Sequence, residues 1–253
     1  MRRTKIYKYF AFGYNYHLLR FYNEDTPVHG RGDTLLSRVD EFVDNLDDLN
    51  LKVTRQAAKK LLRIRADARR LPKDAKVDSA LAQRVSEAVE ALDATLDAEL
   101  QLRTAYVVTP KRFDIVHLVD SPAELLGKKT YNELSPICQA DFSDACRCVA
   151  FGVPTGAAFY LMRCVEGVLR SYYCRVVRRG RLKTMLWKGM IDHLRKRRDS
   201  PPKEMLDALD NLRYNYRNPT QHPDKRFDID EAQDLLAATI DAINRMVRDM
   251  IQR

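Results

Sequence analysis

Arg217 and His222 are separated by four residues near the C-terminal end of the chain, in the run Arg-Asn-Pro-Thr-Gln-His-Pro of residues 217–223. Histidine has an ordinary pKa near ~6.5, so it can take up or release a proton close to neutral pH. Arginine keeps its charge and presents a fork of N–H donors that suits phosphate oxygens. These two residue types together indicate proton transfer beside a stabilised anion.

The same spacing occurs a second time, between Arg112 and His117, so spacing alone does not identify a site. Residues 113–116 are largely apolar and read as a strand or a short helix, with no basic neighbourhood nearby in the sequence. We therefore interpret this second pair as a coincidence.

The first pair lies instead at a predicted junction between helices. Pro219 disfavours a helical Asn218, and Pro223 again prevents simple continuation, so Arg217 is expected to close a helix. On one regular helix, residues five apart point about 140° away from each other. A broken junction can turn Arg217 and His222 toward the same point.

A bundle of five helices is predicted to position this junction in the C-terminal half of the chain. Apolar residues recur there at spacings of three and four, and prolines stand where new helices would begin. The last helix has the clearest start, because Asp228 and Glu231 have the spacing of a capping box. The predicted helices cover about residues 140–151, 154–177, 182–196, 201–216 and 228 to the end.

These features resemble the HEPN superfamily, and in particular the bacterial HEPN proteins of defence and toxin systems. The resemblance lies in the order of five helices, in Asn218 directly after the arginine, in the R-N-x-x-x-H spacing just before the final helix, and in Glu166 on the second helix. It covers about residues 136–253, which we predict to form a HEPN-like helical bundle. It does not explain residues 1–135.

The resemblance implies an endoribonuclease that needs no metal and no cofactor. Two copies of the chain would form a homodimer with a composite active site, in which Arg217 and His222 are catalytic. His222 would transfer protons while the 2′-hydroxyl of RNA attacks the phosphate, and Arg217 would bind the charge that develops. The products would be a 2′,3′-cyclic phosphate and a 5′-hydroxyl.

The resemblance also implies that two further residues support this site. Asn218 would orient the phosphate or the histidine ring. Glu166 would hold Arg217 or tune His222, and its alternative is an ordinary pairing within its own helix. The arginines available for that pairing are Arg163 and Arg170.

Positive charge is concentrated beside this region. The net charge is +9, and residues 163–198 contain 12 Lys and Arg against Glu166 and Asp192, which is an excess of 12 − 2 = 10. Clustered cations neutralise phosphates, so RNA is an expected partner, although a solvated helix face is an equally simple interpretation. The residues that we predict to bind nucleic acid are Arg163, Arg195, Lys196 and Arg197, with Trp187 and Tyr173 as candidates for stacking on bases.

Residues 1–135 are predicted to form a separate N-terminal helical region with at most a short strand. Eight aromatic residues fall within the first 22 positions and could either pack or stack on unpaired bases. Periodicity predicts a helical hairpin from helices at about 54–70 and 78–102. The strand is expected at 104–108, and a short helix should begin at Ser121-Pro122.

Length, composition and motifs narrow the classes of protein to which this chain can belong. A length of 253 residues and 31% charged residues are typical of a folded globular chain. No run is long enough to span a bilayer, the N-terminus lacks a signal cleavage site, and five cysteines without C-x-x-C spacing favour a reducing cytoplasm. The motifs of P-loop enzymes, serine hydrolases and zinc proteases do not occur.

Other functions stay open at this stage. One is a noncatalytic HEPN-type module that binds or senses nucleic acid or nucleotides. Another is an assembly protein whose N-terminal hairpin oligomerises. As a separate alternative, Arg217 and His222 would only stabilise a helix end. A ribonuclease also needs control, for example by an antitoxin, an activating partner or the N-terminal region.

Overall fold

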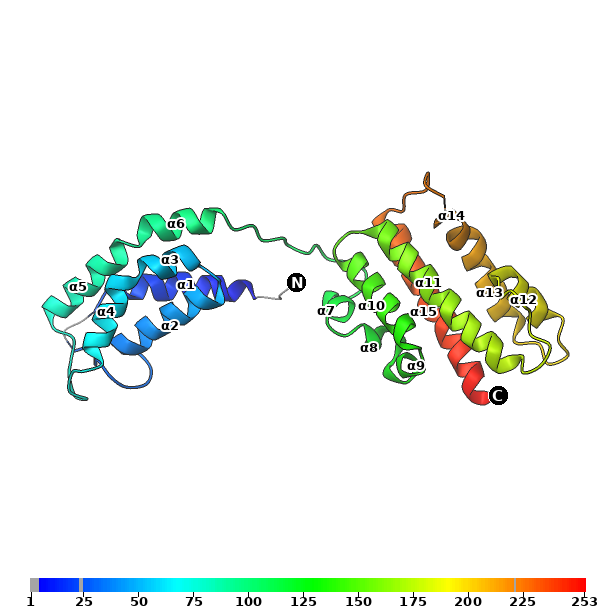
Figure 1. The fold of residues 1–253 in the computed structure, drawn as a ribbon, viewed down its shortest axis with the longest axis horizontal. Coiled ribbons are helices and arrows are strands. Elements are labelled where there is room, and N and C mark those ends of the chain that lie inside the picture. The colour runs from blue at the N-terminus through cyan, green and yellow to red at the C-terminus, as the bar shows by residue number, and fades with distance from the viewer. Residues whose placement is uncertain (1–4, 23–24, 221) are drawn as a thin grey trace. The chain divides into compact units, whose positions relative to one another are not determined.

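In the computed structural model, which describes residues 5–22, 25–220 and 222–253, all regular secondary structure is helical (Figure 1). The only β-type pairing among the described residues is an isolated bridge between Pro27 and Lys76. The predicted all-α fold is confirmed. None of the described helices combines the length and the apolar composition that crossing a membrane requires.

The chain divides into two units, residues 1–106 and 107–253, and each unit has its own hydrophobic core. The first unit contains the two predicted helical segments, but each is broken into two helices, at Ala58 and at Ala91-Leu92. Its helices α4 and α5 contact each other, as a hairpin would. The helices among the described residues of this unit are α1 (Ile6–Leu18), α2 (Leu35–Asp48), α3 (Lys52–Ala57), α4 (Lys59–Ala68), α5 (Ser79–Glu90) and α6 (Asp93–Gln101).

A buried carboxylate fastens the short helix α3 to α6. Glu99 accepts hydrogen bonds from the backbone N–H of Val53 (3.1 Å) and of Thr54 (2.8 Å), and from the Thr54 hydroxyl (2.8 Å). Burial alone would raise the pKa of Glu99, but these hydrogen bonds outweigh burial and hold the pKa below its ordinary value. This titratable group is used entirely for structure.

The boundary between the units lies 29 residues before the predicted boundary at 135/136. Three short helices precede residue 136, and their buried leucines, among them Leu118 and Leu126, belong to the second core. Five-residue helices are too short to show an apolar period, which explains the error. They are α7 (Ile115–Val119), α8 (Pro122–Leu126) and α9 (Lys128–Asn132).

The predicted strand at 104–108 is wrong. Residues 103–111 have no regular secondary structure, and Tyr106 and Val107 are exposed. β-Branched and aromatic residues favour a strand only where a partner strand is present, and the described part of the chain offers none.

The five helices predicted for the C-terminal half are confirmed, with shifted ends. α11 packs against α10 and against α15, and α12 and α13 follow on the other side of α11 (Figure 1). The capping box at the start of α15 is present: Asp228 accepts from the N–H of Glu231 (2.8 Å), and Glu231 accepts from the N–H of Asp228 (3.0 Å). The helices are α10 (Pro136–Ala150), α11 (Pro154–Val176), α12 (Trp187–Arg195), α13 (Lys203–Leu212) and α15 (Ile229–Gln252).

Candidate active site

The helix that carries Arg217 changes its winding just before the candidate site. α13 widens into a π-helical turn over Arg213–Arg217, and the N–H of Asn218 bonds to the carbonyl of Arg213, five residues back. One helical turn, α14 (Asn218–Thr220), follows. π-Helical turns inside helices are frequent at functional sites.

The prediction that Pro219 keeps Asn218 out of a helix is wrong, because both residues lie in α14. A proline ring collides with the carbonyl four residues back in a regular α-helix, and a wider π turn relieves that collision. The Thr220 hydroxyl donates to the carbonyl of Arg217 (2.7 Å) and fastens the turn. The chain then leaves the helix before His222, as predicted.

Arg217 is half-buried and faces helix α11. Its guanidinium lies 3.6 Å from a carboxylate oxygen of Glu166, whose other oxygen accepts from Arg170 at 2.6 Å. Glu166 therefore both holds Arg217 and pairs within its own helix, so the two interpretations from the sequence coexist. Arg163 pairs instead with Asp141 (3.4 Å).

His222 is exposed at the rim of an open cavity of about 420 Å³. Its backbone N–H bonds to the carbonyl of Pro219 (3.0 Å), which fixes the turn that presents the ring. Its imidazole makes no hydrogen bond or ion pair with the residues that the structure describes, so both ring nitrogens are free to meet a ligand. The cavity is lined by Tyr214, Asn218, Pro219, His222, Asp224 and Lys225.

The predicted site residues thus fall into two neighbouring sets. Asn218 and His222 share the cavity, whereas Arg217 lies with Glu166 and is absent from the cavity lining. Within the described part of the chain, no hydrogen bond joins the side chains of Arg217 and His222.

The segment after His222 is anchored to the helical core. Phe227 is buried, stacks on Tyr216 with ring centroids 6.3 Å apart, and donates its N–H to the Thr155 hydroxyl (3.2 Å). Lys225 lies 4.8 Å above the Phe227 ring and 2.6 Å from Glu231. These contacts keep the wall of the cavity in place.

Sequence reasoning missed three residues that line the cavity: Tyr214, Asp224 and Lys225. Tyr214 could have been found, because it interrupts the polar side of the predicted helix and is 70% exposed. The other two carry no such signal, since charged residues after a helix are ordinary in any loop.

Two of the cations predicted to bind nucleic acid are held in ion pairs with nearby aspartates. Arg195 pairs with Asp207 (2.7 Å) and Asp210 (3.4 Å), and Arg197 pairs with Asp199 (2.9 Å). Arg163 is also held in an ion pair, with Asp141, as described above.

A second set of cations in the basic stretch is exposed and makes no ion pair with any described residue. Arg181 does not belong to this set, because it donates to the carbonyls of Val177 (2.6 Å) and Cys174 (2.7 Å) and so fixes the loop before α12. The free cations lie on the end of α11, on this loop and on α12 with the turn that follows it. They are Arg175, Arg178, Arg179, Lys183, Lys188, Lys196 and Arg198.

The suggestion that Trp187 and Tyr173 stack on bases is wrong. Trp187 is buried and donates to the carbonyl of Leu209 (3.2 Å). Tyr173 is fully buried, and its hydroxyl lies 2.6 Å from Nδ1 of His193. Both rings complete the core of the second unit.

The side chains of the second Arg-to-His pair are both held by carboxylates. The guanidinium of Arg112 bonds to Asp230 (2.9 Å) and to Asp234, and His117 pairs with Glu124 (3.2 Å). Arg112 does line an open cavity of about 540 Å³, but His117 does not. Both side chains fasten the short helices to their surroundings.

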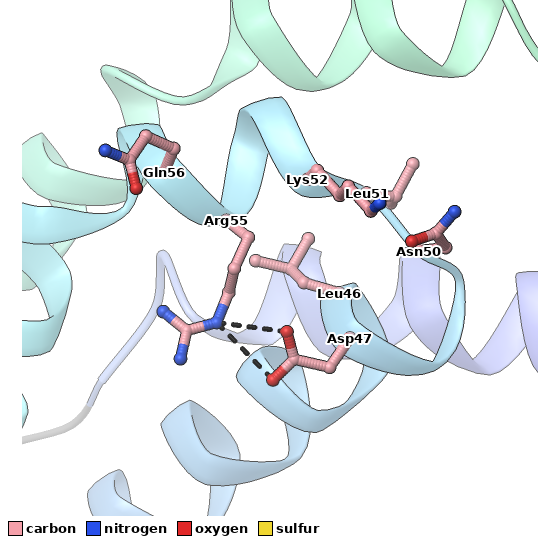
Figure 2. A pocket seen from close by; sticks show the side chains of 7 residues that line it. All are labelled: Leu46, Asp47, Asn50, Leu51, Lys52, Arg55 and Gln56. Carbon is pink, nitrogen blue, oxygen red and sulfur yellow. Dashed lines mark hydrogen bonds and ion pairs between the residues drawn. The ribbon is translucent and has the colours of Figure 1, made fainter.

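A further cavity, of about 420 Å³, lies in the first unit between α2 and α3 (Figure 2). The guanidinium of Arg55, which lines this cavity, is paired with Asp47 at 3.2 Å, as the dashed lines show. No histidine, cysteine, serine or threonine lines it. The cavity at His222 therefore remains the better candidate for chemistry.

Comparisons of the chain with models of known protein families, with curated proteins and with solved structures found no match. Among the described residues, no three His, Cys, Asp or Glu side chains are arranged to hold a metal ion. The case for a function therefore comes from the residues and the fold of this chain.

Proposed function

We propose that this chain is a metal-independent endoribonuclease of the HEPN type, active in the cytoplasm as a homodimer, in bacterial antiviral defence or as a toxin. The observation that carries the proposal is the exposed imidazole of His222, which lines an open cavity and makes no hydrogen bond with a described residue. It lies five residues after Arg217. A HEPN-like bundle of five helices agrees with the helix order.

The proposed reaction needs one base, one acid and one cation. The base removes the proton of a 2′-hydroxyl, the 2′-oxygen forms a bond to phosphorus, and the bond from phosphorus to the 5′-oxygen breaks. The acid returns a proton to that oxygen. His222 of one copy and His222 of a second copy supply these two roles, which balances the protons and consumes no water.

Arg217 stabilises the additional negative charge on the phosphate during this exchange. For that role its guanidinium must reach the phosphate, and the pairing with Glu166 at 3.6 Å is loose enough to be shared with a ligand. Asn218 lines the cavity and orients the phosphate, and Glu166 positions the arginine. In a dimer, a second copy would supply a further Arg217 and His222 to the site.

The cations without ion pairs supply the RNA-binding surface in this proposal. Paired arginines such as Arg195 and Arg197 contribute less, because binding a phosphate would cost them their aspartate partners. Lys196, predicted from the sequence, stays in the set with Arg178, Arg179 and Lys188. Binding should weaken steeply with salt, since each neutralised phosphate releases counterions.

The test is cleavage of total cellular RNA in EDTA by wild type, His222→Ala and the matched control His117→Ala. Wild type and His117→Ala should produce 2′,3′-cyclic phosphate ends, and His222→Ala should be slower by at least ~10²-fold. Because His222 is exposed, the variant should keep the fold, which circular dichroism checks. Equal cleavage by all three proteins would reject the proposed active site. No cleavage by wild type would favour the noncatalytic module or an enzyme that awaits its activator.

A second candidate is a noncatalytic module that binds RNA or nucleotides. It is favoured by one observation, the absence of Arg217 from the cavity lining. It expects RNA binding that survives His222→Ala, with no cleavage by wild type. Fluorescence anisotropy with a labelled RNA separates it from the enzyme.

An active ribonuclease would need restraint, and we propose that the N-terminal region or an antitoxin or activating partner supplies it. The sequence suggested a truncation near Pro136, but residues 107–135 belong to the second core. The informative truncation therefore begins at Val107. If it is no more toxic to cells than the full chain, the N-terminal unit is not the inhibitor.

A further inference from the structure

Helix α1 is apolar on both of its faces, although only one face is packed. Phe12 stacks on Phe42 of α2 with ring centroids 5.6 Å apart, and Tyr16 contacts the same ring at 5.5 Å. The opposite face exposes Tyr7 (71%) and Phe10 (67%), and it continues beyond them. A helix that is apolar all round is normally buried, so the exposed face of α1 lacks a cover.

The exposed aromatics form one continuous stripe. We use the name "α1 stripe" for residues Tyr7, Phe10, Tyr14, His17 and Phe21, which are all exposed. The first four lie on α1 at spacings of three, four and three, which is the period of a helix that packs along a second helix, and Phe21 follows in the segment after the helix. Neighbouring rings already touch, with centroids 5.9 Å apart for Tyr7 and Phe10 and 4.9 Å for His17 and Phe21.

Gly13 adds an independent observation. It lies within α1 beside the stripe, where glycine weakens a helix relative to alanine. A Cβ built on Gly13 meets no atom within 4 Å, so nothing in the described chain requires glycine at this position. A small residue in a helix face permits the close approach of another backbone.

The charges around the stripe argue against RNA as its partner. Lys8 pairs with Asp48 and Arg20 pairs with Asp93, so these two cations beside the stripe are already neutralised, and Lys5 is an exposed cation there that makes no ion pair with a described residue. Sites for single-stranded nucleic acid combine aromatic rings with a positively charged groove. Among the described residues, the α1 stripe has five rings but little unpaired positive charge beside it, which suits an apolar protein surface.

The size of the stripe fits a symmetric pairing. An aromatic side chain offers roughly 200 Å² when fully accessible, so Tyr7, Phe10, Tyr14 and Phe21, exposed by 57–71%, present about 500 Å². Two copies whose stripes cover each other completely would bury about 1,000 Å², which is about the least area expected of a biological interface. A single stripe of uncharged rings is also complementary to itself, as a twofold contact requires.

We infer that the α1 stripe is a homodimerisation surface, which pairs with the α1 stripe of a second copy of this chain. The inference does not rest on the ribonuclease proposal, because it concerns the other unit and none of its catalytic residues. It has a consequence for that proposal. Pairing through α1 would raise the local concentration of two C-terminal units, which residues 103–111 tether to the first units.

The first experiment measures self-association of the full chain by sedimentation velocity over a range of concentrations. Phe10→Glu places a charge in the stripe and should raise the dimer dissociation constant at least ~10-fold. Leu71→Glu is the matched control, since Leu71 is an exposed leucine of the same unit outside the stripe, and it should leave the constant unchanged. Equal effects of the two variants, or none from Phe10→Glu, would overturn the inference.

Gly13→Ala provides a second variant that does not threaten the fold. On a free helix surface alanine should raise the melting temperature and leave association unchanged. In a helix–helix contact it should weaken the dimer several-fold, while the melting temperature of the dissociated chain rises. An unchanged dissociation constant would show that no backbone approaches Gly13.

A photocrosslinking residue at position 14 identifies the partner directly, in a mixture of ¹⁴N- and ¹⁵N-labelled full chains. Crosslinked peptide pairs that join α1 to α1 with mixed labels would support the inference. Crosslinks to residues 107–253 within one chain, to RNA, or to lipid vesicles added to the sample would overturn it, as would no crosslink between copies.

Discussion

The chain contains the same Arg-to-His spacing twice in one compact unit, and the two pairs have different surroundings. Arg112 is bound by two aspartates of α15, and His117 is bound by Glu124. Arg217 has one loose carboxylate partner, and the imidazole of His222 has none among the described residues. Spacing alone therefore selects candidate pairs. The side chains that lack hydrogen-bond partners decide which pair can act on a ligand.

The largest expected effect separates the two arginines. If the ribonuclease proposal holds, Arg217→Ala should lower the cleavage rate by ~10²–10³-fold, because it removes the donors that stabilise the transition state. Arg112→Ala should change the rate less than about twofold, because its donors already bond to carboxylates. Initial rates on one labelled RNA give both numbers, and similar losses would end the distinction between the pairs.

A smaller effect is expected from the carboxylate that distinguishes the first pair. Glu166→Gln keeps the shape of the side chain and removes the charge shared by Arg217 and Arg170. The cleavage rate at saturating RNA should fall about 10-fold as Arg217 loses its position, while KM changes little. Glu166→Asp should restore part of the rate. A change in KM alone would show that Glu166 acts on RNA binding.

The π turn can be tested through the proline that follows it. Pro219→Ala restores an N–H and removes the ring that disfavours a regular α-helix. Loss of the extra residue in the turn would rotate the following residues by about 100°, which should lower cleavage several-fold without lowering the melting temperature. Unchanged cleavage would mean that the π turn does not position His222.

Much of the fold was accessible from the sequence because its signals are local. Apolar periodicity located α11 and α15, and the capping-box residues Asp228 and Glu231 marked the start of α15. The start of α8 was predicted correctly at Ser121-Pro122, whereas α7 was read as either a strand or a short helix and α9 was not predicted, since five residues give little more than one turn of pattern. The domain boundary failed for the same reason, because it depends on which core receives Leu118 and Leu126.

The site was accessible only in part. The sequence suggested the proximity of Arg217 and Glu166, and the ion pair at 3.6 Å agrees with it. It could not tell the free cation Arg178 from the paired Arg195, because pairing depends on aspartates of a different helix. The sequence also could not decide whether Trp187 is buried or stacks on bases, since a tryptophan at the start of an amphipathic helix can do either.

The smallest expected effect concerns stability and completes the comparison. Arg112→Ala should lower the melting temperature by a few degrees, because the segment loses the two side-chain ion pairs of Arg112 with α15. Arg248→Ala is the matched control, since Arg248 is exposed on the same helix and pairs with no described residue. Exposed ion pairs contribute little individually, but Arg112 joins two carboxylates to a segment without regular structure. If Arg248→Ala costs as much as Arg112→Ala in differential scanning calorimetry, those ion pairs do not stabilise the unit. Arg112 would then be as available for a ligand as Arg217.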